Sequence, residues 1–482
     1  MLATQMVRNM TSFRFVSLAG RFATISLLLF AAGCVRYTRA PINSNGVLNA
    51  RANLALDAAT LEKTVLSIAP RAMPSGKKLD RLSLFAAILI LDPRVESARA
   101  AIATAKAQAR ASRKAQGSTL TLISEYANDP ATRSPWLLGG TIDIPIDAGG
   151  RRKARLTTAD IAVLVANYDF AETLWAERMS IRRAFADRMI AQRQATLAAQ
   201  VTELRNRQLA VMERRFRAGA AARSELIQVQ LAQASASRLA GDAVARAKQA
   251  ERSITATLGL PETGLSAFDL FWDGFDAPSS DPLLALPTDG RDQALIARSN
   301  ILKSLAAYDQ AESDLRAEVA RQFPAIIVSP GYTWERGLVK LPLSLGLALP
   351  PLDFNRSAIA AAEAKRNQAG QKIEAEIAQA AGTFEASIAE RRQAIVILQK
   401  IRTVDIPSAR RLAAQADAEL LHGSIDRAEW AIAHIAVLQY QLSELDALAR
   451  VHAADSALED AVQRPLEGPE QMIENMLVLA RS

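Results

Sequence analysis

Three histidines are the residues whose chemistry the sequence offers most directly, and they stand at His422, His434 and His452. They lie twelve and eighteen residues apart, so neither interval places two imidazoles on adjacent turns of one helix, as a zinc or copper site would need. The sequence contains no P-loop and no dinucleotide-type glycine run, and its carboxylates stand near Arg and Lys at helix-surface spacing. We therefore expect no enzyme activity, no metal site and no cofactor.

The only cysteine, Cys34, ends a segment with the anatomy of a secretory signal. Three arginines precede an apolar run at 22–30, which is too short for an ordinary transmembrane helix, and the small residues of "AAGC" follow. This segment resembles a bacterial lipoprotein signal, in which the cysteine is lipidated and becomes the first residue, although Ala31 stands where Leu is usual. The alternative is an ordinary signal peptide with an incidental cysteine. Both interpretations predict export.

The composition favours long, slender helices over a bulky globular core. Half of the 482 residues are hydrophobic but only 5% are aromatic, and alanine, the best helix former, supplies most of the apolar total. The formal net charge is +8. Its positive residues are spread beside Glu and Asp, as on solvated helix faces, and form no compact basic block. We therefore expect no nucleic-acid partner.

The chain repeats itself with a period of about 205 residues. A Pro-x-Asp turn places Asp147 and Asp353 206 residues apart, and helix-breaking glycines place Gly219 and Gly423 204 apart. Each copy predicts a helix, two strands, a very long helix and a return helix, in that order. These elements are expected at 91–116, 118–126, 136–147, 150–217 and 224–259, and again at 291–322, 324–334, 338–349, 356–421 and 426–460.

The repeat divides the chain into six predicted segments. A stretch rich in Asp, Pro and Gly separates the two copies and is typical of a linker. The predicted segments are a signal peptide at 1–33, an N-terminal anchor segment at 34–75, the first repeat at 76–261, the linker at 262–288, the second repeat at 289–466 and a C-terminal tail at 467–482.

The predicted strands have one apolar face. The leucines from Leu341 to Leu349 alternate with small or polar residues, and the isoleucines from Ile142 to Ile146 alternate in the same way. Four strands with a lipid-compatible face cannot close a barrel alone, and open sheet edges are not tolerated in hydrocarbon. We therefore expect the chain to assemble with copies of itself, and three copies would supply twelve strands.

The whole order of elements resembles the TolC-type outer-membrane efflux channels, over nearly all of the mature chain. The stretches that carry the resemblance are "PIDAGGRRKARL", "RFRAGAAARSELIQVQLAQASASRLA", "ITATLGLP" and "PLDFNRSAIAAAEAK". The resemblance implies a mainly helical fold with a membrane β-barrel part. It would be an internally duplicated helical barrel with four strands per protomer, and a homotrimer would complete a twelve-stranded barrel.

The resemblance also implies a place and partners for the protein. It would be a passive channel subunit of a tripartite exporter, anchored in outer-membrane lipid of a Gram-negative bacterium and extending into the periplasm. There it would meet a periplasmic adaptor protein and an inner-membrane pump, and export small compounds, drugs or metal ions. In the barrel, the segments Leu341 to Leu349 and Ile142 to Ile146 would face lipid. The residues expected to face the pore are Thr141, Asp143, Lys340 and Ser344.

Two helix–turn–helix tips would dock the adaptor. The family usually has Ser or Thr three residues after the tip glycine, whereas this chain has Ala222 and Asp426. Asp426 can cap a helix and Ala222 cannot, so contact at the first tip must depend on shape, backbone or Ser224. An ordinary helix-ending glycine is the alternative explanation for both tip glycines. The expected docking residues are Gly219, Ala222, Ser224, Gly423 and Asp426.

The two tips also differ in charge. The first carries Arg214, Arg215, Arg217 and Arg223, and the second carries Asp417, Glu419, Asp426 and Glu429. One hypothesis is that these opposite charges on neighbouring hairpins close the periplasmic end, with Arg214, Arg217, Asp417 and Glu419 as the gate candidates. The acidic residues would then ring the aperture and favour cations. The alternative is that these are solvated helix ends of random sign.

Four residues mark the predicted strand-to-helix turns, which need unusual backbone angles. They are Asp147, Gly149, Asp353 and Asn355. Three other classes of protein are weighed against the efflux channel. A type I protein-secretion channel shares the architecture, and a periplasmic coiled-coil lipoprotein scaffold explains the helices and Cys34 but not the strands. A soluble intracellular coiled coil explains neither the signal nor the strands.

Overall fold

A computed structural model describes residues 37–73, 76–114, 116–127, 134–146, 150–279, 290–335, 337–349 and 351–473. The chain divides into two units, Met1–Ala52 and Asn53–Ser482. In the first unit the described residues contain one helix, α2 (Ser44–Ala52), without a buried residue. The expected lipidation site, Cys34, lies outside the described residues, as do Asp147 and Gly149. The second unit contains all the remaining elements.

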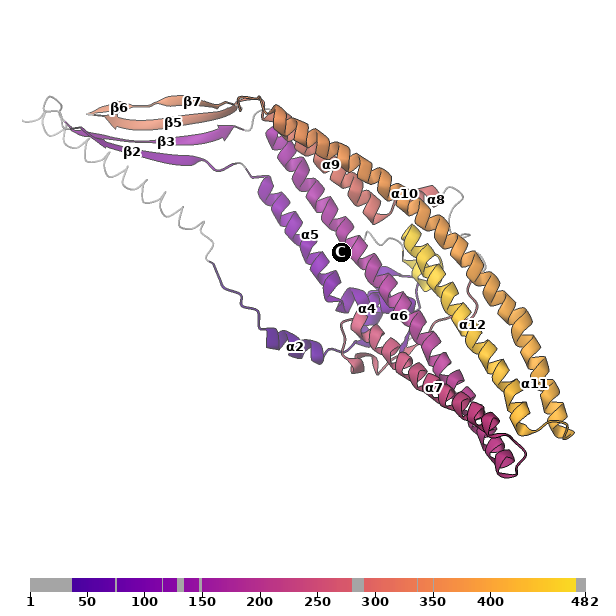
Figure 1. Ribbon diagram of the computed structural model, residues 1–482. Coiled ribbons are helices and arrows are strands. Elements are labelled where there is room, and N and C mark those ends of the chain that lie inside the picture. Colours follow the sequence, from indigo (N-terminus) through magenta and orange to yellow (C-terminus); the bar gives the residue numbers. More distant parts are fainter. Residues whose placement is uncertain are drawn as a thin grey trace, which may run out of the picture. The chain divides into compact units, whose positions relative to one another are not determined.

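The first half of the second unit follows the predicted order (Figure 1). A long helix and a return helix come after a pair of strands, and shorter helices precede the strands. Within this half the expected helix at 91–116 begins at Pro93, because Asp92 is extended and caps it. The elements are α3 (Ala58–Ile68), β1 (Lys78–Leu79), α4 (Arg81–Leu91), α5 (Pro93–Ser112), β2 (Thr119–Tyr126), β3 (Trp136–Ile146), α6 (Arg151–Arg217) and α7 (Arg223–Thr257).

The second half repeats the order after a short connection. Its elements are a 3-10 helix (Glu262–Leu265), β4 (Asp269–Leu270), α8 (Gly290–Ile296), α9 (Ser299–Ala320), β5 (Ala325–Glu335), β6 (Leu338–Lys340), β7 (Leu343–Ala348), α10 (Arg356–Lys400), a π-helical segment (Ile401–Asp405), α11 (Ile406–Leu421), α12 (Arg427–Val462) and a 3-10 helix (Pro469–Met472). The structure thus confirms the predicted fold class for one chain, a duplicated helical body with a β part.

The second half is interrupted at places where the first is continuous. Helix α6 contains neither Gly nor Pro over 67 residues. Its counterpart was expected as one helix at 356–421, but Pro407 has no N–H to continue the α-helical ladder, and Ile406 N–H bonds to the carbonyl of Ile401 in a π-helical turn. The expected strand at 338–349 likewise divides at Pro342, whose carbonyl accepts the N–H of Gly331. The expected helix at 291–322 divides between α8 and α9, a break that the first half shares between α4 and α5.

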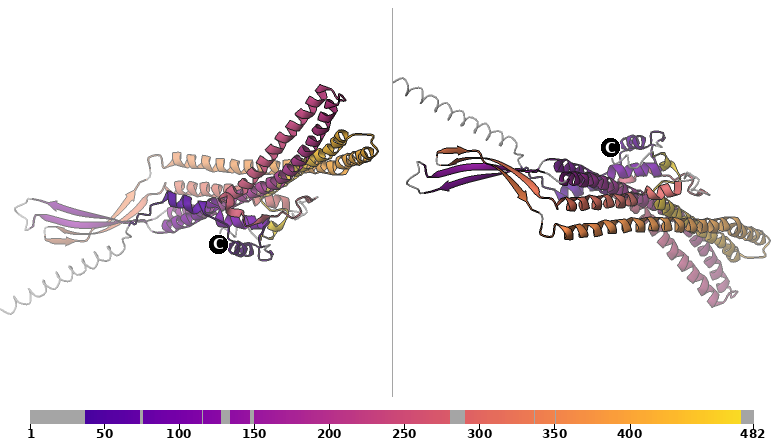
Figure 2. Two further views of the ribbon diagram at one scale, coloured as in Figure 1. Left: turned by 90° about the horizontal axis from the view of Figure 1, so that it is seen from below. Right: turned by 90° about the horizontal axis from the view of Figure 1, so that it is seen from above.

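The larger sheet is antiparallel throughout, in the order β2-β3-β5-β6, with β7 also pairing with β5. It therefore joins a hairpin from each half of the chain. In the second unit this sheet extends from one end of the helices, and the α6–α7 and α11–α12 turns lie at the other end (Figure 2). The helices connect the two ends.

The core lies where the shorter helices pack against α6 and α12. Its aromatic centre contains Phe170 and Phe185 of α6 together with Trp272 and Phe275. The last two belong to the expected linker, whose described part, 262–279, is therefore packed against the core and not an exposed connection. Strand β4 of the same segment pairs with β1 in a small parallel sheet. The expected anchor segment similarly contributes α3 to the core.

Among the helices that the structure describes, none is both long enough and apolar enough to be a membrane span.

Candidate functional site

The register of the sheet gathers the predicted apolar residues onto one face. Residues directly opposite each other in antiparallel strands point to the same side. Leu120 pairs with Ile142 and Val328 pairs with both Ile144 and Leu345, so the apolar residues continue across all the strands. We call this side the apolar face. It is formed by Leu120, Leu122, Leu138, Ile142, Ile144, Ile146, Ile326, Val328, Leu343, Leu345 and Leu347.

The opposite side, which we call the polar face, carries mostly small and polar residues, together with the apolar Ile123, Leu137, Ile327 and Leu338. Thr121 pairs with Thr141, Ser329 pairs with Ser344, and the predicted pore residues Asp143 and Lys340 lie on this side opposite Thr119 and Thr333. The apolar face remains open in the described chain, since Leu343, Leu345 and Leu347 are 75%, 66% and 54% exposed. A soluble sheet would cover such a face with another layer.

Aromatic side chains gather on the apolar face at the end of the sheet farthest from the helices. Tyr126 pairs with Trp136, their ring centroids 5.0 Å apart, and Tyr332 and Trp334 follow on β5. Amphipathic aromatic rings at one end of a leucine-rich surface are typical of a membrane–water interface. The apolar face therefore has the composition of a lipid-facing surface with an interfacial belt.

The two edges of the sheet are unpaired in the part of the chain that the structure describes. Strand β2 forms one edge and is exposed along its whole length, while β6 and β7 form the other. Each edge presents backbone N–H and C=O groups that need partners, especially in a membrane. Both edges of the sheet are thus open to pairing with further strands.

The strand-to-helix turn of the second half depends on Asn355. This residue adopts a left-handed conformation, with φ of +60°, and is largely buried. Its amide donates hydrogen bonds to the backbone and the carboxylate of Glu318 on α9, at 2.8 and 2.9 Å. Asp353 accepts from the Ser357 hydroxyl, which with the Ser357 and Asn355 N–H groups lowers the pKa of that carboxyl. The turn therefore fixes the start of α10 against α9. In the first half, Gly150 occupies the equivalent left-handed position, with φ of +85°.

The two hairpin turns share one backbone geometry. We call residues 214–225 the first tip and 417–429 the second tip. Gly219 and Gly423 have φ of +74° and +73°, a region that only glycine adopts freely. In each tip the residue after the glycine donates its N–H to a carbonyl five residues earlier: Ala220 to Arg215 at 2.8 Å, and Ser424 to Glu419 at 2.9 Å. Duplication has preserved the turn.

The caps of the two return helices differ, as the sequence predicts. Asp426 accepts hydrogen bonds from the N–H groups of Ala428 and Glu429, at 2.8 and 3.0 Å. Ala222 has no side-chain acceptor, and the only side-chain contact at this start of α7 is the Glu225 carboxylate accepting the Ala222 N–H. Ser224, the other expected contact residue, is exposed.

The tips are joined by an ion pair that the sequence analysis did not assign. Nε of Arg215 lies 2.8 Å from Oδ2 of Asp426. The expected gate residues make other contacts within the chain. Arg214 and Arg217 donate to backbone carbonyls of α6, Asp417 accepts from Trp430 and His434, and Glu419 accepts from Gln415. Within the described part of one chain, Arg215 and Asp426 therefore link the two hairpins, while the role of the predicted gate residues stays a prediction.

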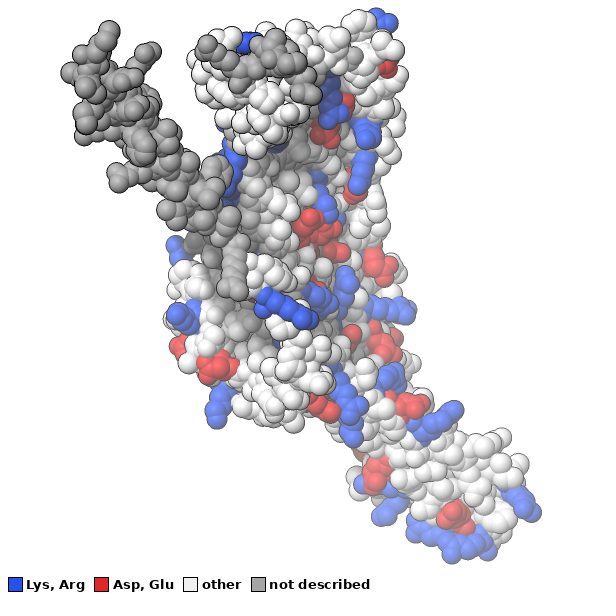
Figure 3. All heavy atoms as spheres, turned by 90° about the vertical axis from the view of Figure 1, so that its left-hand side faces the viewer, with Lys and Arg blue, Asp and Glu red and all other residues white. Residues whose placement is uncertain are grey.

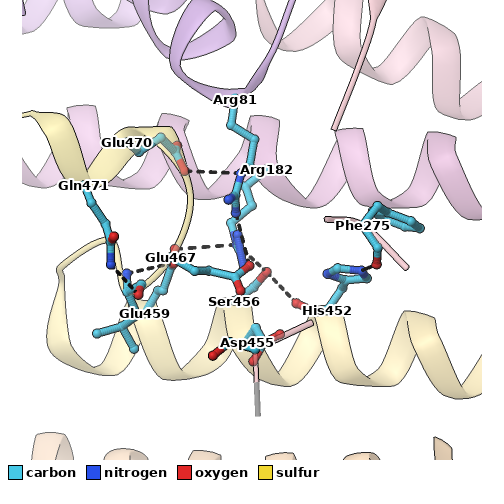
Figure 4. Close-up of polar contacts among 12 residues, drawn as sticks. Arg81, Arg182, Phe275, His452, Asp455, Ser456, Glu459, Glu467, Glu470 and Gln471 are labelled. Carbon is cyan, nitrogen blue, oxygen red and sulfur yellow. Dashed lines mark hydrogen bonds and ion pairs between the residues drawn. The ribbon is translucent and has the colours of Figure 1, made fainter. Parts of the chain in front are cut away.

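A second set of charges lies deep in the helical body, near the middle of α6 and at the C-terminal end of α12. We call it the buried network, and Figure 4 draws most of it. Arg178 of α6 contacts Glu459 of α12 at 2.8 Å and Glu470 at 2.9 Å. Glu467 contacts both Arg81 and Arg182, at 3.2 and 3.3 Å. The network consists of Arg81, Arg178, Arg182, Glu459, Glu467 and Glu470.

The charges of the buried network stabilise one another against burial. Burial by itself disfavours the charged forms, but the Glu470 and Glu459 carboxylates outweigh it and raise the pKa of Arg178. In the same way Arg182 and Arg178 lower the pKa of Glu459 despite its burial. The charged forms of Arg178 and Glu459 are therefore stabilised by their partners. Since the expected C-terminal tail supplies Glu467 and Glu470, its described part is an integral part of the core.

Two further titratable groups lie beside the buried network on α12. His452 bonds to the Phe275 carbonyl at 2.9 Å, and burial, reinforced by the nearby Arg182 charge, lowers its pKa to about 4. Asp455 pairs with Arg391 at 2.5 Å, yet burial and the Glu467 charge raise its pKa to about 6. Burial thus favours the neutral form of both groups, the deprotonated imidazole of His452 and the protonated carboxyl of Asp455.

Sequence reasoning missed the buried network for a definite reason. Arg178 and Arg182 are four residues apart and share a helix face with Trp175 and Phe185, which is a weak signal of burial. The neighbouring Arg183 is exposed, however, and arginine is usually a surface residue. Their carboxylate partners lie more than 270 residues further along the chain.

The described residues contain no group of three or more His, Cys, Asp and Glu side chains arranged to hold a metal ion. Of the three histidines, His434 bonds to Asp417 and stacks against Trp430 at the second tip, and His452 is in the core. The arrangement offers contact surfaces and a sheet in need of partners.

Comparison with known proteins shows which class this chain resembles. Residues 84–260 match the family described as Outer membrane efflux protein. Together with the fold, this match confirms the predicted likeness to TolC-type outer-membrane efflux channels.

Particular relatives agree with this class. The chain is 25% identical over 217 residues to the cobalt-zinc-cadmium resistance protein CzcC of Cupriavidus metallidurans, covering 45% of this chain and 50% of that protein. It thus spans about half the length of the curated relative it matches. Among solved structures, the CmeC outer membrane channel of Campylobacter jejuni aligns with a TM-score of 0.67 and 12% identity, over 93% of this chain and 94% of that one. The outer membrane protein VceC of Vibrio cholerae aligns at 0.65 and 15%, over 80% and 97%. At these low identities, the two alignments show similarity of fold alone.

Proposed function

We propose that the chain is one subunit of a homotrimeric outer-membrane channel, the passive conduit of a tripartite efflux system. The observation that carries this proposal is the sheet. It has an apolar face that crosses all its strands, an aromatic belt at its outer end and two unpaired edges. Three such sheets joined edge to edge would satisfy the edge groups and place the polar face around a pore.

The polar face would then line the conduit. It presents Thr141, Asp143, Ser344 and Lys340, which leave a wet, permissive surface without a strongly selective site. The apolar face, with Leu343 to Leu347 and Ile142 to Ile146, would contact outer-membrane lipid. In this arrangement the helices continue the conduit into the periplasm, and lipidation at Cys34 would anchor the chain in the same membrane.

The two tips would meet the periplasmic adaptor protein, which connects the channel to an inner-membrane pump. They are the parts of the helical body farthest from the sheet (Figures 1 and 2), and their glycine turns are rigidly defined. The Arg215–Asp426 pair between them is half exposed, so it can hold the tips together and still be broken by a partner. Gating would act on this contact.

The cargo would be small compounds, either drugs or metal ions, selected by the partner pump. The likeness to the cobalt-zinc-cadmium resistance protein makes divalent metal cations the first compounds to test. Growth of a channel-deficient host carrying this gene, with its adaptor and pump, on zinc and on drugs would distinguish the two cargo classes.

The assembly is tested with Cys34→Ser protein extracted in detergent. Light scattering should give the mass of a trimer, circular dichroism should show a minor β fraction, and planar bilayers should show single-channel conductance. A chain that becomes soluble without detergent once Cys34 is replaced would instead be a lipid-anchored helical scaffold. That result would overturn the channel proposal.

A further inference from the structure

The first tip is strongly basic. Arg214, Arg217 and Arg223 lie within ten residues of one another, around Gly219, and all three side chains are exposed. Figure 3 shows Lys and Arg side chains gathered over the end of the α6–α7 hairpin, with few acidic neighbours. The charge is specific to this hairpin. Residues 201–250 contain nine Lys and Arg against four Asp and Glu, whereas the equivalent residues 405–454 contain four against seven.

The three arginines of the first tip are available for a partner. Nε of Arg214 donates to the Ala210 carbonyl and Nε of Arg217 to the Glu213 carbonyl, and both residues remain exposed. Within the described ranges none of the three forms an ion pair. The remaining arginine of the cluster, Arg215, is already engaged by Asp426.

The start of α7, in the middle of this cluster, also needs an acceptor. Asp426 provides a carboxylate to the first turn of α12, but the equivalent residue of the first tip is Ala222. A helix N-terminus favours negative charge, and an aspartate or glutamate from outside would serve there as the missing cap. Phe216 and Ile227, 38% and 45% exposed, add apolar surface beside the arginines.

We propose that the first tip is the docking surface for an acidic turn of a helical hairpin on the periplasmic partner. This inference rests on the proposed function, because it assigns a chemistry to the partner that the tips would meet. Arginine guanidinium groups bind carboxylates with paired hydrogen bonds, so Arg214, Arg217 and Arg223 select glutamate- or aspartate-rich turns. The second tip lacks this property, so the two halves of one chain bind different parts of the partner.

The test uses the full-length Cys34→Ser protein in detergent and a fluorescent synthetic helical hairpin whose turn is flanked by glutamates. An otherwise identical hairpin with lysines is the comparison probe. Fluorescence anisotropy should show binding of the glutamate hairpin that weakens as salt rises. Replacing the three arginines together (Arg214→Gln, Arg217→Gln and Arg223→Gln) should weaken binding by about tenfold, since three exposed ion pairs are lost.

The matched control makes the same charge change higher on the same hairpin, with Arg238→Gln, Arg246→Gln and Lys248→Gln, which are also exposed. It should bind as the parent does. The inference is overturned if the control loses as much affinity as the tip variant, if the lysine hairpin binds better, or if the parent binds neither probe. It is also overturned if the tip variant no longer forms trimers, because the arginines would then belong to a contact between copies.

The binding test does not depend on conductance. A protein that conducts in bilayers but fails to bind the glutamate hairpin keeps the proposed function and loses this inference. If the triple variant loses helical signal, the three single substitutions are measured in its place, and an absence of any loss of affinity among them overturns the inference.

Discussion

Helices α6 and α12 are joined by ion pairs at two levels, and the two pairs have the same length in opposite surroundings. Deep in the body, Arg178 lies 2.8 Å from Glu459, and neither side chain is more than 1% exposed. At the tips, Arg215 lies 2.8 Å from Asp426, with the two side chains 40% and 28% exposed. The N···O distance therefore does not show how much each ion pair stabilises the contact between the two helices.

The exposure of each ion pair determines how strongly it holds the two helices together. Separating a buried pair leaves an uncompensated charge in a medium of low dielectric, which is strongly unfavourable. Separating an exposed pair exchanges it for water and salt at little cost. The two helices are thus held together strongly at the buried network and more weakly at the tips. A channel that is gated at one end would require this difference.

The largest loss of stability is expected from a substitution that breaks ion pairs of the buried network. Glu470→Gln leaves Arg178 and Arg81 with less compensating charge in the core, and should lower the free energy of unfolding by about 3–5 kcal/mol. Thermal unfolding in detergent, followed by circular dichroism, measures this change. Glu262→Gln, which removes the exposed partner of Arg252, is the control and should have almost no effect. Equal losses of stability in the two variants would contradict the stabilising role of the buried network.

The second prediction concerns how the stability of the protein depends on pH. His452 has a pKa of about 4 in the fold against 6.5 unfolded, so stability is lost as pH falls from 6.5 towards 4, by about 3 kcal/mol in all. Asp455 has a pKa of about 6 against 3.8, so its contribution rises over almost the same range as pH falls. In the native protein the two effects largely cancel.

Single variants should separate these two effects. Asp455→Asn should make unfolding midpoints fall steeply from pH 6.5 to pH 4.5, and His452→Gln should make them rise, whatever each substitution does to stability at neutral pH. Midpoints measured across this range are the test. Parallel pH profiles for the two variants would show that neither group titrates as its burial implies.

A third, smaller effect is expected from exchanging the caps of the two tips. Asp426→Ala removes the cap of α12 and should cost about 1 kcal/mol, while Asp426→Asn keeps the cap and should cost much less. Ala222→Asp should stabilise the start of α7 by a similar amount. Hydrogen exchange of the amides at 223–226 and 427–430 localises the change. Protection that is unaltered in all three variants would mean that the side chains do not control fraying at the tips.

The smallest effect is expected from the ion pair between the tips. Arg215→Gln should lower stability by at most about 1 kcal/mol, and less at high salt, because both side chains are partly exposed. Conductance should rise nonetheless, since the contact restrains the tips. Single-channel recordings at low and high salt check this. A large, salt-independent loss of stability would place the pair among the structural contacts of the core and end the contrast between the two levels.

Local features of the fold could be predicted from the sequence because they depend on neighbouring residues. The alternation at Leu341 to Leu349 is a property of one strand, and the glycine turns at Gly219 and Gly423 depend on a single residue each. The division of the last strand at Pro342 and the π-helical turn before Pro407 follow from the missing proline N–H, and the same reasoning applied more closely would have located them.

The long-range contacts could not be predicted in this way. Arg178 and Glu459 are 281 residues apart, and nothing in the residues around either one identifies the other. The four arginines of the first tip and the four acidic residues of the second allow many pairings, and only the fold selects Arg215 with Asp426. A single sequence shows which charges exist, while their partners depend on how the two halves pack.

The order of the buried network along the chain has a consequence for how the protein is made. Arg81, Arg178 and Arg182 emerge early during synthesis, and the carboxylates that neutralise them follow only after residue 458. Until then, packing α4 against α6 would bury cations without counter-charges, which is unfavourable. A growing chain is therefore expected to keep these helices apart until Glu459, Glu467 and Glu470 have been made. A chain truncated before these residues would then fail to close the helical body.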